Sequence, residues 1–222
     1  MEKYRIEKKF LIYNYDKSFV NNLIKINSFF FKKKYRGRFI NNIYFDDINF
    51  TSYTDNLLGI SKRKKVRIRW YGDLIGSIIN PYLEIKSKVN LYGFKNKIKL
   101  NNFELNKKII LKDLLNDHNI PNQISKLSIT PVLINRYFRE YYETIDGKFR
   151  VTIDSDLKYF STKTKSINFE NSFKENNILI IELKFSPKFQ ELANRISDQF
   201  PFRSTKSSKY VMGVSRLYDS VA

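Results

Sequence analysis

Residues 64–72 read KKVRIRWYG, and apolar and cationic side chains alternate strictly along this stretch. A period of two is typical of a β-strand with one apolar face and one polar face. Because the pattern recurs along the chain, it predicts a largely antiparallel sheet whose charged side chains share one face. The recurrences are YRIEKKF (4–10), YLEIKSK (82–88), KNKIKL (95–100), FRVTIDSD (149–156) and IIELKFS (180–186).

Helical signals are interspersed with these strands, so the expected class is α+β. Asp16 opens a predicted helix, and Gly59 closes another that covers 49–59. Asp146-Gly147 is a strong hairpin signal. No Gly/Ser-rich linker interrupts the chain, which favours a single domain over 1–222. Further strands are predicted at 39–46, 129–143, 147–160 and 167–170, a helical insertion within 106–127, and helices at 187–200 and 205–218.

The formal net charge of +19 is the strongest compositional signal, because a charge of that size attracts polyanions. The lysine run at 32–34 is expected to be a solvated loop. The absence of cysteine excludes disulfides and thiolate chemistry. No secretory signal and no apolar run of membrane-spanning length occurs, so we expect a cytoplasmic protein without a transmembrane segment.

If helices cover the apolar face of the sheet and the charged face turns inward, the sheet would form an antiparallel barrel with a charged tunnel. Cations outnumber carboxylates on that face, so the missing partner should be anionic. The planar forks of Arg67 and Arg69 suit phosphate oxygens. Carboxylates on the same face, Glu84, Glu182 and Glu7, suit Mg²⁺ or Mn²⁺ bridging those oxygens. These residue types together predict metal-assisted phosphoryl transfer.

Other sites lack support in the sequence. There is no GxxxxGK[ST] loop, and the single histidine, His118, lacks partner ligands nearby in the sequence. The aromatic residues show no stacking motif typical of RNA-binding domains, so no nucleic-acid partner is expected.

The ordered series of strand motifs resembles the VTC domain, the polyphosphate polymerase domain of the triphosphate tunnel (CYTH) superfamily, in its stand-alone bacterial form. The resemblance extends from Arg5 to about Tyr218 and implies a basic antiparallel tunnel, flanked by helices, that binds ATP and polyphosphate with a divalent metal. The motifs are R-x-E-x-K at 5–9, KVRIRWYG at 65–72, LEIK at 83–86, RYFR at 136–139, RVTID at 150–154, IELK at 181–184 and SSKY at 207–210.

The resemblance also implies roles for individual residues. Glu182 would be the principal metal ligand, with Glu84 and Glu7 as further candidates. Tunnel hydrolases usually have ExExK on the first strand, whereas Arg5 stands at the first of those positions here, which favours the polymerase branch. The cations expected to act on phosphates are Arg67, Arg69, Arg136, Arg150 and Lys209 as catalytic residues, and Lys9, Lys86, Lys97, Lys99 and Lys184 as binding residues.

The expected reaction transfers the γ-phosphate of ATP to a growing polyphosphate chain. A triphosphatase or polyphosphatase could use the same tunnel with water as acceptor. A non-catalytic polyphosphate-binding or RNA-binding module is the alternative outside the enzymes. The resemblance leaves a membrane subunit open as a partner.

Overall fold

The computed structural model describes residues 5–89, 92–162, 169 and 172–218. Its main sheet has nine strands in the order β1-β11-β9-β8-β2-β3-β5-β6, with β10 pairing β9, and β4 and β7 form a second sheet. The strands are β1 (Ile6–Tyr13), β2 (Phe31–Asp46), β3 (Lys62–Tyr71), β4 (Gly76–Ile78), β5 (Tyr82–Val89), β6 (Tyr92–Lys99), β7 (Phe103–Leu105), β8 (Thr130–Thr144), β9 (Phe149–Ser161), β10 (Phe173–Lys174) and β11 (Ile178–Phe185). The helices are α1 (Lys17–Ile26), α2 (Thr51–Leu57), η1 (Leu111–Asn116), α3 (Asn122–Ser125), η2 (Pro187–Phe189), α4 (Gln190–Ser197) and α5 (Lys209–Leu217).

The chain divides into two compact units, and β2, β8 and β9 contribute residues to both. Unit 1 comprises 1–38, 137–157 and 175–207, and unit 2 comprises 39–136, 158–174 and 208–222. The prediction of a single domain stays a prediction. In the described part of the chain, no helix is long and apolar enough to cross a membrane.

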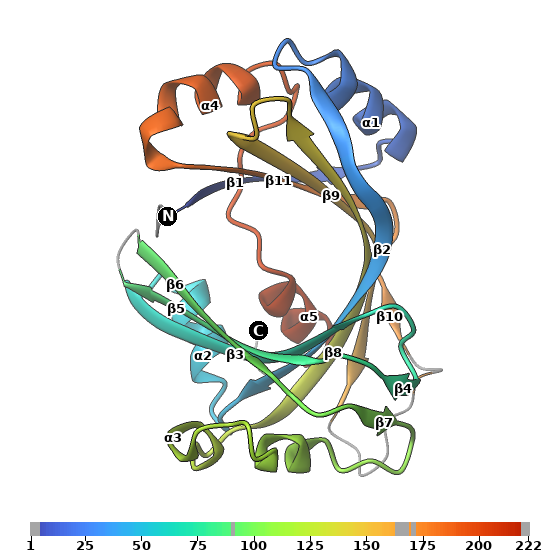
Figure 1. The fold of residues 1–222 in the computed structure, drawn as a ribbon, viewed down its shortest axis with the longest axis vertical. Coiled ribbons are helices and arrows are strands. Elements are labelled where there is room, and N and C mark those ends of the chain that lie inside the picture. The colour runs from blue at the N-terminus through green and yellow to red at the C-terminus, as the bar shows by residue number, and fades with distance from the viewer. Residues whose placement is uncertain (1–4, 90–91, 163–168, 170–171, 219–222) are drawn as a thin grey trace. The chain divides into compact units, whose positions relative to one another are not determined.

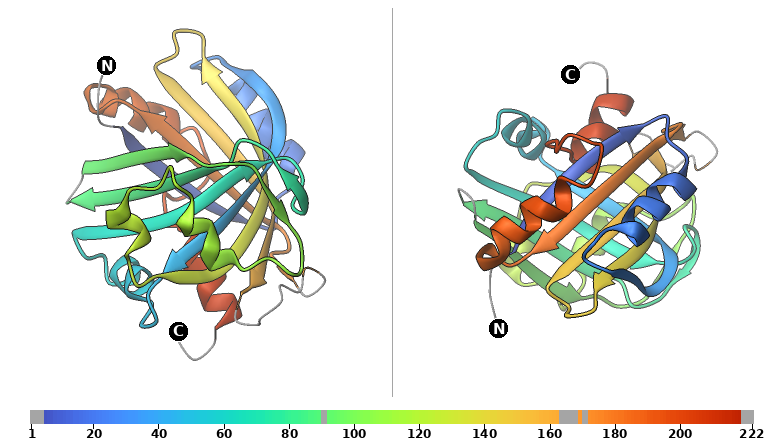
Figure 2. Two further views of the ribbon diagram at one scale, coloured as in Figure 1. Left: turned by 60° about the horizontal axis from the view of Figure 1, so that its bottom comes forward. Right: turned by 90° about the horizontal axis from the view of Figure 1, so that it is seen from above.

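In unit 1, α1 and α4 cover one face of the sheet formed by β1, β11 and β9 (Figures 1 and 2). The helices are amphipathic: Val20 and Ile24 of α1 and Ile196 of α4 are fully buried against the strands. Burying each such side chain stabilises the unit by roughly 1.5–3 kcal/mol. On the same face, Lys8 donates to Asn194 Oδ1 of α4 at 2.7 Å. The opposite face of these strands carries the charged side chains.

Unit 2 repeats this division of faces. Val66, Ile68 and Trp70 of β3 are buried in a core that η1 and α3 close, and Figure 1 shows α3 beneath β3, β5 and β6. Helix α5 packs closely against Tyr159 of β9, because a Cβ added at Gly213 would lie 2.6 Å from the Tyr159 ring. The alternation in KKVRIRWYG thus separates a core face from a charged face, as the sequence predicts.

Most predicted elements are confirmed, including the Asp146-Gly147 hairpin, in which Gly147 has a φ of +69°. The expectation of a solvated loop at 32–34 is wrong. These lysines lie within β2, which begins at Phe31, although their side chains are exposed as predicted. The helical insertion consists of two short elements, η1 and α3. The strand predicted at 167–170 falls largely outside the described residues.

Candidate functional site: two charged clusters

The first cluster, called the arginine cluster, joins Arg67, Arg69, Glu84 and Lys95 in unit 2. The pairing of β3 with β5 places Arg67 opposite Glu84. Arg67 donates to Glu84 Oε2 through Nε at 2.9 Å and Nη2 at 2.7 Å. Arg69 Nη1 lies 3.6 Å from the same oxygen, and Lys95 Nζ of β6 lies 2.5 Å from Glu84 Oε1. Three cations therefore converge on one carboxylate.

Glu84 is buried, with 2% of its surface exposed. Burial alone would raise the pKa of Glu84, but the charges of Arg69, Arg67 and Lys95 outweigh it and hold this pKa well below its usual range. Sequence reasoning offered Glu84 as a metal ligand, whereas the structure surrounds it with cations. We assign it the role of a counter-ion that holds the two guanidinium groups in place.

Neutral side chains orient the two arginines further. Arg69 Nε donates to Asn42 Oδ1 at 2.7 Å, and Asn42 in turn donates to Asn135 Oδ1 at 2.7 Å. Arg67 Nη1 donates to the Tyr44 hydroxyl at 3.0 Å. Both arginines are thereby restricted to one orientation before any anion binds, which lowers the entropic cost of binding. Sequence reasoning missed these partners, because only strand register brings them together.

The predicted lysines of β5 and β6 lie on the same face as the arginine cluster. Lys86 is exposed and stands opposite Lys95 in the β5–β6 register. Lys97 Nζ lies 3.5 Å from the centre of the Tyr82 ring, and Lys99 is exposed. The structure therefore brings both Lys97 and Lys99 to this face. With Lys65, this face of unit 2 carries more cations than Glu84 alone neutralises.

The SSKY motif begins α5, with Ser208 as its N-cap. Lys65 Nζ donates to Ser208 Oγ at 2.9 Å, which ties the charged face of β3 to this helix start. Lys209, predicted to reach the phosphates, is half-buried in the first turn of α5. The Tyr210 hydroxyl donates to Asp46, and burial together with that carboxylate raises the pKa of Tyr210 far above its usual value. Tyr210 therefore stays neutral and structural.

The second cluster, called the carboxylate cluster, lies in unit 1 on β1, β11, β8 and β9. Register places Lys9 opposite Glu182 and Glu7 opposite Lys184. Lys184 Nζ lies 3.0 Å from Glu182 Oε2 and 3.9 Å from Glu7 Oε1, while Lys9 Nζ lies 3.7 Å from Glu182 Oε1 and 3.9 Å from Glu7 Oε2. The structure thus brings four of the predicted site residues together, two carboxylates and the two lysines that they share.

Arg139 and Asp154 complete the carboxylate cluster, and sequence reasoning did not include either among its site residues. Arg139 donates to Asp154 through Nε at 2.5 Å and Nη2 at 2.6 Å, in the bidentate geometry that suits a carboxylate. Its Nη2 also lies 3.4 Å from Glu182 Oε2. Asp154 is fully buried. Arg139 therefore positions Glu182 while itself remaining fixed by Asp154.

The fit of a divalent metal to the carboxylate cluster follows from its donors. No group of three or more His, Cys, Asp or Glu side chains that could hold a metal alone occurs among the described residues. Mg²⁺ commonly binds through one or two carboxylates and takes its other oxygens from water and phosphates. Glu182 and Glu7 match that requirement. Thr152, opposite Glu182 in the sheet, has a buried hydroxyl without a hydrogen-bond partner in the described part of the chain, which leaves room for one more polar ligand.

Arg136 lies apart from both clusters, whereas Arg150 of β9 stands opposite Lys184 at the margin of the carboxylate cluster. Arg136 is two residues from the core residue Ile134 and therefore lies on the core side of β8. There the Cζ atom of its guanidinium lies 3.9 Å from the centre of the Phe39 ring. It donates to Asn41 Oδ1 and to Gly72 O, both at 3.2 Å. The geometry does not support a phosphate-binding role for Arg136, and Arg139 takes the charged side of the strand instead. Arg150 is half-exposed and donates to Glu143 Oε1 at 2.6 Å.

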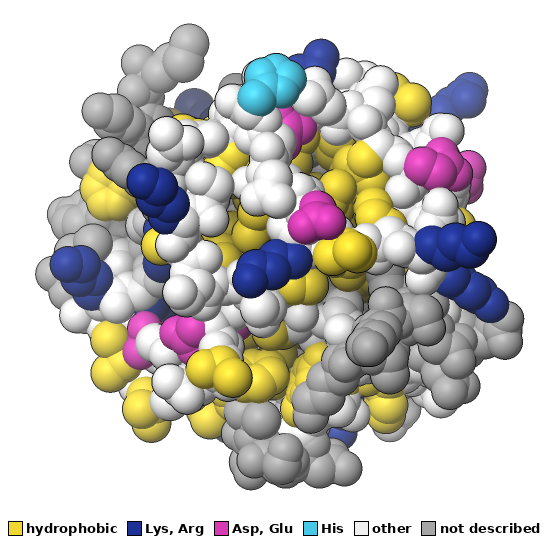
Figure 3. Space-filling view, turned by 90° about the horizontal axis from the view of Figure 1, so that it is seen from below, with side chains coloured by type: hydrophobic (Ala, Val, Ile, Leu, Met, Phe, Trp, Pro, Cys, Tyr) yellow, Lys and Arg dark blue, Asp and Glu magenta, His cyan; other side chains and the backbone are white. Residues whose placement is uncertain are grey.

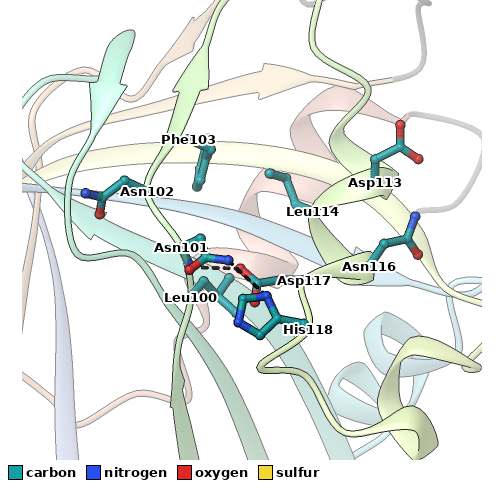
Figure 4. A pocket seen from close by; sticks show the side chains of 9 residues that line it. All are labelled: Leu100, Asn101, Asn102, Phe103, Asp113, Leu114, Asn116, Asp117 and His118. Atoms are coloured by element: carbon teal, nitrogen blue, oxygen red, sulfur yellow. Dashed lines mark hydrogen bonds between the residues drawn. The ribbon is translucent and has the colours of Figure 1, made fainter.

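A surface pocket of about 360 Å³ lies in unit 2, between residues 100–103, which follow β6, and residues 113–118 of and after η1 (Figure 4). It includes His118, whose Nδ1 lies 3.3 Å from Asn101 Nδ2. Asp117 is already occupied, since its carboxylate accepts the backbone N–H groups of Asn101 and Asn119. No lysine or arginine is among the described residues that line it, and Lys and Arg side chains are scattered over the face around the histidine (Figure 3). This pocket is unsuited to phosphate.

Glu84 gives a testable pH dependence. A carboxylate with a lowered pKa stabilises the fold above its unfolded pKa of roughly 4.3, and this stabilisation is lost as the pH falls through the folded pKa. We expect Glu84→Gln to lower the free energy of unfolding by about 3 kcal/mol at neutral pH. Glutamine does not titrate, so the difference in free energy of unfolding between the wild type and Glu84→Gln should shrink as the pH is lowered. Urea unfolding curves at several pH values measure this difference. Glu104→Gln, at an exposed carboxylate of β7, is the control, and a difference independent of pH would contradict the assignment.

Comparison with known proteins shows the family to which the chain belongs. The family model of the VTC domain matches residues 3–218, so the chain belongs to the VTC domain family. The fold is shared with solved structures that are 11–14% identical in sequence. They include a candidate adenylyl cyclase from Hippeastrum described as having a dominant triphosphatase activity (14% identity, TM-score 0.52, 97% of this chain and 99% of that one).

Two further structures show the same fold. The PH1819 protein from Pyrococcus horikoshii matches with a TM-score of 0.54 at 14% identity, over 96% of this chain and 99% of that one. A candidate adenylate cyclase from Vibrio parahaemolyticus matches with a TM-score of 0.53 at 11% identity, over 96% and 99%. The predicted α+β class, with antiparallel strands flanked by helices, is confirmed, and these solved structures share the fold.

Proposed function

We propose that this protein is a polyphosphate polymerase that transfers the γ-phosphoryl group of ATP to a growing polyphosphate chain. The observation that carries the proposal is the excess of fixed cations around Glu84, because such a face is stabilised by an anion with several charged oxygens. Membership of the VTC domain family supports the same substrate class.

The chemistry asks little of the protein beyond positioning and charge. A terminal oxygen of the acceptor phosphate forms a new bond to the γ-phosphorus, while the bond from that phosphorus to the bridging oxygen breaks and ADP leaves with the electron pair. The acceptor is already anionic, so no general base is required. Arg67 and Arg69, fixed by Glu84, Asn42 and Tyr44, bind phosphate oxygens and stabilise the charge of the transition state.

The carboxylate cluster would hold the divalent metal, Mn²⁺ or Mg²⁺, through Glu182 and Glu7. A divalent cation held there would neutralise charge on the phosphate oxygens of the substrate. Lys9 and Lys184 flank the same carboxylates and bind further phosphate oxygens. Arg139 holds Glu182 in place.

Hydrolysis is the second candidate function, with water instead of phosphate as the acceptor. It is favoured by the similarity in fold to the Hippeastrum protein, which is described as having triphosphatase activity. A binding module without turnover is the non-enzymatic alternative.

The test is whether the consumption of ATP depends on a primer. Purified protein is incubated with ATP and Mn²⁺, with and without short-chain polyphosphate, and ADP is followed with time. A polymerase releases ADP faster when primer is present and lengthens the primer. ADP release that ignores the primer, with free phosphate as the product, would favour hydrolysis. Tight polyphosphate binding without ADP would leave only the binding module.

A further inference from the structure

The first half of β2 carries a row of exposed cations in unit 1. Lys32, Lys34, Arg36 and Arg38, called here the β2 ladder, occupy alternate positions of one strand and are all exposed. Alternate residues of a strand share a face and are spaced by roughly 6.7 Å, so the four side chains form a line roughly 20 Å long.

Contacts with β8 show which face the ladder occupies. Lys34 Nζ lies 2.5 Å from Glu143 Oε2, and Arg38 Nε donates to the Tyr141 hydroxyl at 3.1 Å. Along β8, alternation places Glu143 and Tyr141 on the same face as Arg139, which belongs to the carboxylate cluster. The ladder therefore belongs to the same charged face of unit 1 as the carboxylate cluster.

The balance of charge on this face is strongly positive. Arg150 also contacts Glu143, so Glu143 is shared by Lys34 and Arg150. Glu140 is bound by Lys17 and Lys33, and Lys33 lies between ladder positions and therefore on the opposite face. Glu143 alone thus cannot neutralise the ladder, and positive charge remains in excess around it.

Protection of a sheet edge is the simpler explanation of these residues. The pairing of β2 with β3 begins at Ile40, so the ladder lies on the part of β2 beyond that pairing. Lysines on an edge strand prevent association with other sheets. Edge protection does not require the charges to share one face, whereas here four cations lie in a row on the face that also carries the carboxylate cluster.

We propose that the β2 ladder binds an extended polyphosphate chain outside the catalytic centre, along the first half of β2. This inference rests on the proposed function, which makes a long chain of phosphates. Polyphosphate is favoured over nucleic acid because the ladder shares its face with the carboxylate cluster and because Arg38 already covers the Tyr141 ring, which would otherwise offer a stacking platform.

The experiment compares long-chain polyphosphate with tripolyphosphate in a direct binding titration. The ladder variant replaces Lys32, Lys34, Arg36 and Arg38 with serine. The control variant removes the same charge from exposed lysines elsewhere, with serine at Lys25, Lys64, Lys108 and Lys112. We expect the ladder variant to bind the long chain at least about tenfold more weakly and with a reduced dependence on salt, and the control to lose less than about threefold. Both variants should bind tripolyphosphate as the wild type does, which also reports that they are folded.

Equal losses in the two variants would overturn the proposal, because net charge alone would then explain them. A matching loss of tripolyphosphate binding would also overturn it, since the ladder would then belong to the primary site or to the fold. Single-stranded RNA is titrated in parallel, and if RNA bound more tightly than polyphosphate through the ladder, the partner would be nucleic acid. Failure of the proposed function is separate: it would show as an absence of primer-dependent ADP release, whatever the ladder binds.

Discussion

Arg139→Ala should lower the free energy of unfolding by about 3–5 kcal/mol, because it leaves the fully buried carboxylate of Asp154 without its bidentate partner. The penalty comes from the uncompensated charge more than from the lost attraction. Adding Asp154→Ala should therefore restore part of the stability. Urea unfolding of the wild type, the two single variants and the double variant measures this.

Arg150→Ala is the matched control for Arg139→Ala. It removes another arginine–carboxylate pair between β9 and β8, with a similar Nε–Oε1 distance of 2.6 Å, but the side chain of Arg150 is 51% exposed. Because Arg150 is half-exposed and Glu143 keeps Lys34 at 2.5 Å, the loss should stay below about 1 kcal/mol. Equal losses at Arg139 and Arg150, or a double variant less stable than Arg139→Ala, would show that burial of Asp154 is not the source of the effect.

Arg67→Ala should reduce kcat/KM for phosphoryl transfer by about 100-fold or more, the usual effect of removing one preorganised donor to a charged transition state. Glu84 keeps Arg69 and Lys95, so the fold should survive. Steady-state kinetics with ATP and primer, together with a thermal unfolding curve, separate the two effects.

Lys64→Ala is the control for Arg67→Ala. Lys64 lies on the same strand with its side chain exposed, and alternation puts it on the opposite face. Its kinetics should match those of the wild type. If Arg67→Ala left turnover intact, or if Lys64→Ala reduced turnover equally, phosphate binding by the charged face of β3 would be contradicted.

Strands with strict alternation could be predicted from the sequence because the apolar pattern determines which side is buried. KKVRIRWYG is such a strand, and its alternation was enough to predict that Arg67 and Arg69 lie on the face opposite the core. The first half of β2 has no such pattern: Phe31 is its one buried residue before Ile40, and KKKYRGR resembles a solvated run. It is a strand because neighbouring β8 supplies its partner, and that pairing is not encoded locally.

The choice between Arg136 and Arg139 was beyond sequence reasoning for a related reason. Residues three apart lie on opposite faces of a strand, so one arginine of RYFR must face the core. Both faces of β8 mix aromatic and charged residues, with Phe138 and Glu140 on one and Tyr137 and Arg139 on the other. Likewise, the role of Glu84 as a counter-ion depends on the register of three strands, which brings Arg67, Arg69 and Lys95 to it.

The most direct test of the central claim is the fate of the γ-phosphate of ATP. The protein is incubated with ATP labelled at the γ-phosphorus, Mn²⁺ and short-chain polyphosphate, and the label is separated into free phosphate and polymer. Transfer to polyphosphate predicts that the label accumulates in chains longer than the primer, in step with ADP. Label found only as free phosphate, with the primer unchanged in length, would contradict a polymerase and identify water as the acceptor.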